Sequence, residues 1–127
     1  MDKRENVVAR LKAITGNANV LTNEKDRKFY SSDLSCTKGE IAEVVVRPSN
    51  ATELADCVKI ATNSGMSVVP RGGGMSYTRG YQPENSGSVL VDMRSMDKVL
   101  EINSEDMYVT VESGCTWKKL YEALAEQ

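Results

Sequence analysis

The stretch VVPRGGGMSYTRG, from Val68 to Gly80, places three consecutive glycines directly behind a short apolar run and a proline. Glycine adopts backbone conformations that are closed to residues with a Cβ atom. Successive amide groups in such a loop can converge on one point and hold an anion. The loop therefore predicts either a flexible turn between strands or a binding site for a phosphate group.

The residues before this loop predict a strand, a helix and a second strand. Three consecutive valines, Val44–Val46, indicate a strand within 41–48 that is buried on both faces, as in a parallel sheet. Asn50 is expected to cap a helix over 51–64, with Glu53 as its capping-box partner. The second strand covers 67–70, so the glycine loop leaves its carboxyl end, where α/β sheets bind ligands. This position favours a binding site over a turn.

Further elements flank this βαβ unit. Apolar residues at helical spacing predict a helix over 4–15, whereas the polar residues 17–40 predict an irregular segment. After the loop we expect a strand over 88–93, a hairpin formed by 98–103 and 107–113 with one buried face, and a helix over 116–126.

The predicted fold class is α+β with α/β-like character: a small, partly parallel sheet with flanking helices. Strands 41–47, 67–70 and 88–92 are expected to share this sheet, the first two running parallel.

Composition excludes several classes of site. The chain has 127 residues, a net charge of −2 and no histidine, which argues against a nucleic-acid surface and removes His-dependent catalysis and His metal ligands. Cys36, Cys57 and Cys115 lie far apart, so we expect free thiols. No stretch predicts a membrane span or a secretory signal, and the cytoplasm is the expected location. We predict no metal site and no catalytic residue in this chain.

Two common phosphate-binding motifs do not fit the glycine loop. A P-loop requires a lysine after its last glycine, and the stretch from Gly74 to Gly80 has none. A dinucleotide fingerprint requires a third glycine where Tyr77 stands, and the turn-forming residues that follow predict no long helix.

Five segments, in this order and spacing, resemble the N-terminal part of the PCMH-type (vanillyl-alcohol oxidase-type) FAD-binding domain. The nearest branch is that of the FAD-linked oxidases with D-lactate dehydrogenase and the glycolate oxidase flavoprotein subunit. The residue pattern predicts an N-terminal helix and irregular segment over 1–39, and the resemblance implies an incomplete FAD-binding domain over 40–127. The segments are YSSD (30–33), VVVRPSNATEL (44–54), VVPRGGGMSYTRG (68–80), VDMRSMDKVLEIN (91–103) and VTVESGCTWKKLYEAL (109–124).

The resemblance also implies the cofactor site. The family's pyrophosphate loop, Pro-x-Gly-Gly-Gly-x-Ser, corresponds to Pro70, Arg71, Gly72, Gly73, Gly74, Met75 and Ser76. Members that tether FAD covalently carry histidine at the position of Met75. We therefore expect FAD to be bound non-covalently.

Other polar and aromatic residues have a structural and a functional interpretation. Arg71 and Arg79 are expected, from the residues alone, to be solvated or ion-paired, with phosphate binding as the alternative. Asp92 and Arg94 predict a local pair, and Trp117 predicts a core residue rather than a flavin contact. Further residues are Tyr77 (cofactor contact or core), Gly114 (close approach to the adenosine part or freedom at the helix start), and Lys118 and Lys119 (solvent-facing).

The resemblance implies that this chain is the FAD-binding segment of a flavin-dependent oxidoreductase that oxidises a 2-hydroxy acid or a related alcohol. Its catalytic residues would lie in parts of the family that this chain lacks, and substrate would be bound by those C-terminal parts. The alternative is a stand-alone nucleotide- or phosphate-binding module without redox activity. A diverged relative of the dehydrogenase that reduces an enolpyruvyl sugar nucleotide fits the segments from Val91 onward less well.

The apolar side of helix 116–126 predicts an exposed patch or a dimer that covers it.

Overall fold

The central sheet of the computed structural model, which describes residues 2–127, has four strands in the order β1-β2-β4-β3. Strands β2 (Val44–Val46) and β3 (Ser67–Arg71) both run parallel to β4 (Ser88–Asp92), which lies between them. A short strand β1 (Val20–Leu21) pairs antiparallel with β2. The predicted sheet is confirmed, and β4 separates the two strands of the βαβ unit.

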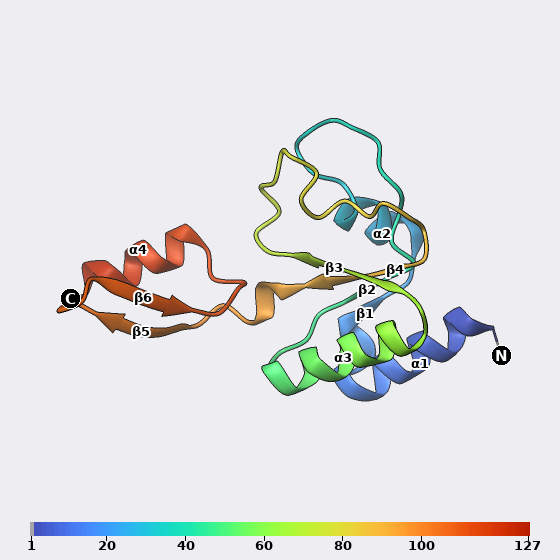
Figure 1. Cartoon of the computed structure of the whole chain (residues 1–127), viewed down its shortest axis with the longest axis horizontal. Helices are drawn as coiled ribbons and strands as arrows, with labels where there is room; N and C mark the ends of the chain where they lie inside the picture. Colours follow the sequence, from blue (N-terminus) through green and yellow to red (C-terminus); the bar gives the residue numbers. More distant parts are fainter. Residues whose placement is uncertain (1) are drawn as a thin grey trace.

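The three valines of β2 are buried because helices cover both faces of the sheet. Val44 and Val46 pack in a cluster with residues of α1 (Lys3–Thr15) and α3 (Ala51–Asn63). Val45 points to the opposite face, where it packs with Tyr30 of α2 (Glu24–Tyr30). Figure 1 shows α1 and α3 on one side of the sheet and α2 on the other. We call the part formed by residues 2–96 the N-terminal lobe.

The expectation of an irregular segment over 17–40 is wrong in part. This segment contains the 3₁₀ turn η1 (Asn17–Asn19), strand β1 and helix α2. Asn23 caps α2 because its side-chain oxygen accepts from the amide of Asp26 at 2.9 Å. Only Tyr30 is buried in this helix, so its sequence has no apolar periodicity that would have predicted it.

The C-terminal lobe, residues 97–127, follows the 3₁₀ turn η2 (Met93–Ser95). Strands β5 (Val99–Asn103) and β6 (Tyr108–Val111) form an antiparallel hairpin, and α4 (Trp117–Ala125) packs on β5. Figure 1 shows this lobe projecting away from the central sheet. None of the helices described between residues 2 and 127 has the length and apolar content that a bilayer crossing requires.

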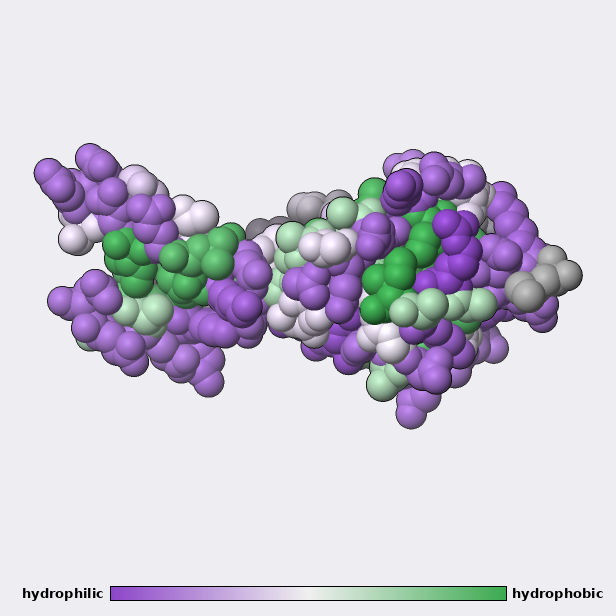
Figure 2. All heavy atoms as spheres, turned by 90° about the horizontal axis from the view of Figure 1, so that it is seen from below, coloured by the Kyte–Doolittle hydropathy of each residue, from purple (hydrophilic) through white to green (hydrophobic). Residues whose placement is uncertain are grey.

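The expectation of a buried hairpin face is wrong. Met107 is 89% exposed, and Val109 and Val111 are 36% and 37% exposed. Trp117, predicted to be a core residue, is 76% exposed. Figure 2 shows hydrophobic side chains gathered on the surface of this lobe, which consists of one helix and two strands. The exposed apolar side of α4 is as predicted, since Leu124 is also 39% exposed.

Candidate functional site

The three glycines after β3 differ in what each position requires. Gly74 has a φ of +79°, in the region that favours glycine. Gly73 has no positive φ, and a Cβ atom added there would meet nothing within 4 Å. The conformational need for glycine is therefore at Gly74, whereas Gly73 leaves open space beside the backbone.

The loop presents backbone donors that the protein itself does not use. Within residues 2–127, the amides of Gly73, Gly74, Met75 and Ser76 donate to no other backbone or side-chain group. Backbone amides are strong donors that require an acceptor, from water or from a ligand. Four consecutive free amides make this loop suited to an anion.

Other hydrogen bonds hold the loop in this shape. The hydroxyl of Tyr81 donates to the carbonyl of Gly74 at 3.0 Å, and the amide of Leu34 donates to the carbonyl of Ser76 at 2.9 Å. The hydroxyl oxygen of Ser76 accepts from the amide of Gly80 at 3.0 Å. The side chain of Ser76 thus stabilises the turn that follows the glycines.

Asp33, in the YSSD segment, fastens the same turn from outside. Its carboxylate accepts from the amide of Arg79 at 2.8 Å and from the side chain of Gln82 at 2.7 Å. Arg79 has a φ of +63°, so this bond accompanies a backbone conformation unusual for a non-glycine residue. Burial is the largest influence on Asp33 and raises its pKa, but the hydrogen bonds from Ser35, Arg79 and Gln82 together hold the pKa below its usual value.

A cavity of about 520 Å³ lies between this loop and the start of α4. It is lined by Gly72–Ser76 and Tyr81 on one side and by Cys115–Lys118 on the other. Because α4 begins at Trp117, the cavity faces the positive end of a helix dipole as well as the free amides of the loop. No local pattern in the sequence predicts that residues 115–118 lie beside the loop. Lys118 is exposed, as predicted, but it also lines the cavity.

Gly114 packs closely against η2 at the junction of the two lobes. Its amide donates to the carbonyl of Met96 at 2.8 Å. A Cβ atom at Gly114 would overlap the carbonyl of Met93 and lie 2.7 Å from the oxygen of Met96. Glycine is therefore required here for close packing of the C-terminal lobe on η2, which neither of the two expected roles describes.

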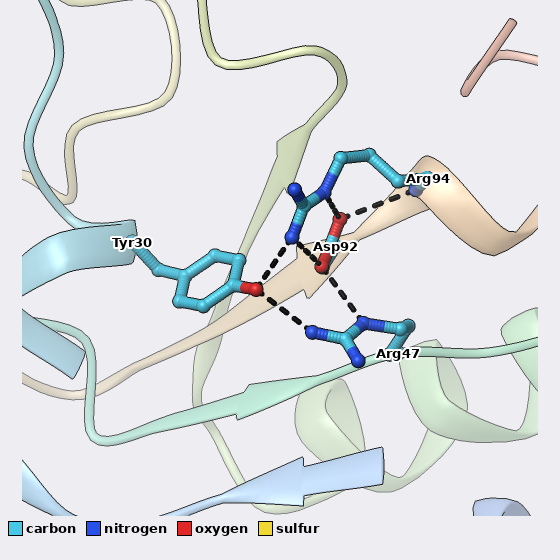
Figure 3. A network of polar contacts seen from close by, with 4 residues as sticks. All are labelled: Tyr30, Arg47, Asp92 and Arg94. Carbon is cyan, nitrogen blue, oxygen red and sulfur yellow. Dashed lines mark hydrogen bonds and ion pairs between the residues drawn. The ribbon is translucent and has the colours of Figure 1, made fainter. Parts of the chain in front are cut away.

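A polar network occupies the carboxyl end of β4 beside the site (Figure 3). The buried carboxylate of Asp92 pairs with Arg47 Nε and with Arg94 Nη2, both at 2.9 Å. Both arginines also donate to the hydroxyl oxygen of Tyr30, at 2.7 and 2.5 Å. Burial, the largest influence, raises the pKa of Asp92, yet the bonds from Arg94 and Arg47 outweigh it and hold the pKa below its usual value. The predicted Asp92–Arg94 pair is confirmed, and Arg47 joins it from β2's carboxyl end.

The remaining predicted residues lie in different surroundings. Pro70 is exposed within β3, and Met75 and Tyr77 are 72% and 74% exposed, so Tyr77 is not a core residue. The expectation that Arg71 is solvated or ion-paired is wrong, because Arg71 is 6% exposed and has no ion pair among residues 2–127. Across the same described range, no cluster of three or more His, Cys, Asp or Glu side chains is placed to hold a metal ion.

One family model and several known proteins match this chain. The family model described as FAD binding domain matches residues 42–127, which include the glycine loop and both walls of the cavity. The 1'-carboxy-chondrochloren decarboxylase of Chondromyces crocatus is 27% identical over 124 residues, covering 97% of this chain and 23% of that protein. The probable mitochondrial D-lactate dehydrogenase of Danio rerio is 30% identical over 122 residues, covering 96% of this chain and 24% of that protein.

A solved structure of p-cresol methylhydroxylase with substrate bound superposes with a TM-score of 0.84 at 22% identity. The match covers 98% of this chain and 25% of that one, and at this identity it concerns the fold. The chain thus spans about a quarter of the length of the relatives that it matches.

Proposed function

We propose, for a chain that belongs to the FAD binding domain family, that its glycine loop holds the diphosphate of FAD. The observation that carries the proposal is the row of free amides from Gly73 to Ser76, in residues that line a cavity. A hydrogen bond to a charged group contributes about 1.5–3 kcal/mol, so several such donors bind a diphosphate without a lysine. The proposed cofactor-binding residues are Pro70, Arg71, Gly72, Gly73, Gly74, Met75 and Ser76.

The residues present fit this cofactor in shape as well as in charge. Gly73 leaves space for close approach of the diphosphate to the backbone, and the start of α4 adds a favourable dipole on the opposite wall. Gly74 and Tyr81 keep the loop in its bent conformation. This chain supplies the wall of the site that binds and orients the diphosphate.

We also propose that FAD is bound non-covalently. Met75 is exposed at the position where the resemblance places a tethering histidine, and the chain contains no histidine. Acid precipitation of the flavin-loaded protein should release all flavin into the supernatant. Flavin that remains with the precipitated chain would contradict this mode of binding.

For the whole protein we propose oxidation of a 2-hydroxy acid or a related alcohol, with the bound flavin accepting the hydride. The similarity to a probable D-lactate dehydrogenase supports this substrate class. The test mixes the flavin-loaded whole protein with 2-hydroxy acids and with simple alcohols under anaerobic conditions. Reduction of the flavin is measured as the loss of its visible absorbance. A flavin that no member of this panel reduces would contradict the substrate class and leave the FAD site standing.

A second partner is proposed from the apolar face of the C-terminal lobe. Trp117, Tyr121 and Leu124 are exposed on α4, and a large exposed apolar patch is unusual on a monomer. We propose that two copies of this chain associate through this face.

The test of the diphosphate site compares two glycine-to-valine substitutions. Gly73→Val places a branched side chain in the space beside the free amides, whereas Gly87→Val adds the same side chain at an exposed glycine outside the cavity. FAD should raise the melting temperature of the wild-type chain and of Gly87→Val, by linkage of about 2.7 kcal/mol at one hundred times the dissociation constant. FAD should leave the melting temperature of Gly73→Val unchanged. If FAD raises the melting temperature of both variants equally, the glycines form only a turn. The same result is expected of a module that binds its nucleotide elsewhere.

A further inference from the structure

Arg71 carries a buried positive charge beneath the glycine loop. Its side chain leaves the end of β3, and the residue is only 6% exposed. Its guanidinium carbon lies 5.0 Å from the ring centres of Tyr30 and Tyr81 and 5.6 Å from that of Phe29. Contacts of a cation with aromatic faces are favourable and do not cancel the charge.

No carboxylate of the described chain neutralises this guanidinium. Among residues 2–127, Arg71 makes no ion pair, and its buried Nε and Nη1 atoms have no hydrogen-bond partner. The neighbouring arginines differ, because Arg47 and Arg94 both pair with Asp92 (Figure 3). An unpaired buried charge is costly, so its retention calls for an anion that the protein itself does not provide.

The guanidinium lies directly against the loop that carries the free amides. A Cβ atom added at Gly74 would lie 2.8 Å from Cζ of Arg71. Tyr81, one of the rings around Arg71, also donates to the carbonyl of Gly74. The guanidinium therefore packs against the backbone of Gly74, and Gly74 also lines the cavity.

We infer that Arg71 is the buried countercharge of the anion at the glycine loop, and that it makes this site selective for a diphosphate over an uncharged nucleoside. The inference rests on the proposed function. Arg71 acts as a positioning residue: it supports Gly74 by packing, and its charge acts on the anion through the loop. In surroundings of aromatic rings and backbone such a charge is screened far less than in water. Arg71 lines a second cavity, of about 620 Å³, which Gly73, Gly74 and Tyr81 also border. The lining of this second cavity adds Lys28 and Arg94, and its one carboxylate, Asp33, accepts backbone and side-chain hydrogen bonds.

The experiment measures binding of ADP and of adenosine to the chain by calorimetry or NMR titration. Wild type should bind ADP more tightly than adenosine. Arg71→Met keeps the length and apolar contacts of the stem but removes the charge, and should weaken ADP binding about 10- to 100-fold while adenosine binding stays within about twofold. Arg71→Lys, which keeps a charge without the planar group, should retain part of the preference for ADP.

The outcomes separate the two proposals. If wild type binds neither ADP nor FAD, the proposed function fails and this inference fails with it. If wild type prefers ADP and Arg71→Met keeps the same ratio of ADP to adenosine affinity, only the role of Arg71 is wrong. A loss of both ligands in equal proportion would likewise indicate a purely structural role and overturn the inference.

A measurement on the unaltered chain covers the case in which Arg71→Met does not fold. The Nε–H resonance of Arg71, identified by its position among the aromatic rings, should move on addition of ADP and stay in place on addition of adenosine. A resonance that ADP at saturation leaves unmoved would overturn the inference.

Discussion

Every residue of β4 in the N-terminal lobe is buried, whereas every residue of β6 in the C-terminal lobe is exposed. Between Asp97 and Gln127 only Gly114 is buried, and it is buried by the turn that joins the lobes. The N-terminal lobe therefore has its own core on both faces of a sheet. The C-terminal lobe is largely exposed, and one of its surfaces is a wall of the proposed FAD site.

The largest effect is expected from Asp92→Ala. This change leaves Arg47 and Arg94 without their buried partner, and should lower the free energy of unfolding by about 3 kcal/mol, discounted for the partial exposure of both arginines. The matched control is Asp97→Ala in the C-terminal lobe, which removes an exposed ion pair with Lys119 and should have no measurable effect. Urea unfolding of both variants is the measurement, and equal losses would erase the contrast between the lobes.

The same carboxylate predicts a pH dependence of the N-terminal lobe. Its pKa is lower in the folded chain than in the unfolded chain, so the unfolded chain binds more protons at acidic pH. The stability that ionised Asp92 contributes is fully present above the unfolded pKa and is lost as the pH falls through the folded pKa. Unfolding curves of wild type below about pH 4 should show this loss, and Asp92→Asn should show a shallower dependence. Parallel pH profiles for the two proteins would contradict the assignment.

Gly114→Ala tests the junction between the lobes. The added methyl group would overlap the carbonyl of Met93, so the C-terminal lobe must move away from η2. FAD affinity should fall about tenfold, equal to about 1.4 kcal/mol, because the cavity has one wall on each lobe. Flavin fluorescence titration measures this, with Gly87→Ala as the control. Unchanged affinity would mean that the two walls do not act together.

The smallest effect is expected at the apolar face of α4. Tyr121→Glu combined with Leu124→Glu should reduce the self-association of the chain several-fold and leave the melting of the N-terminal lobe unchanged, since both residues are exposed. Sedimentation velocity over a range of concentrations measures the association. A wild-type chain that stays monomeric at all concentrations would remove the proposed dimer.

The sequence allowed the sheet and the position of the loop to be predicted because local patterns determine both. Val44–Val46 indicate burial on two faces, and Asn50 caps its helix as expected, accepting from the amide of Glu53 at 2.9 Å. Helix α2 was missed because its one buried residue gives no periodicity. The apolar alternation of β6 is typical of a half-buried strand, yet all four of its residues are exposed.

The composition of the candidate site was predicted less completely. The segment YSSD could be aligned, but nothing local indicates that Asp33 fastens the turn at Arg79. The environment of Arg71 depends on rings from α2 and from Tyr81, which only the tertiary fold brings together. The need for glycine at position 114 likewise arises from a contact with Met93, distant in sequence.

The central claim is tested most directly by hydrogen exchange at the loop amides, which NMR monitors residue by residue. The chain is measured with FAD and with riboflavin, which lacks the diphosphate. At saturation FAD should slow exchange at Gly73, Gly74, Met75 and Ser76 about tenfold or more, as acceptors occupy these donors. The amide of Gly87, outside the cavity, should be unaffected, and riboflavin should leave all of them unchanged. If FAD binds while the four loop amides exchange as fast as in the free chain, the diphosphate lies elsewhere and the central claim is wrong.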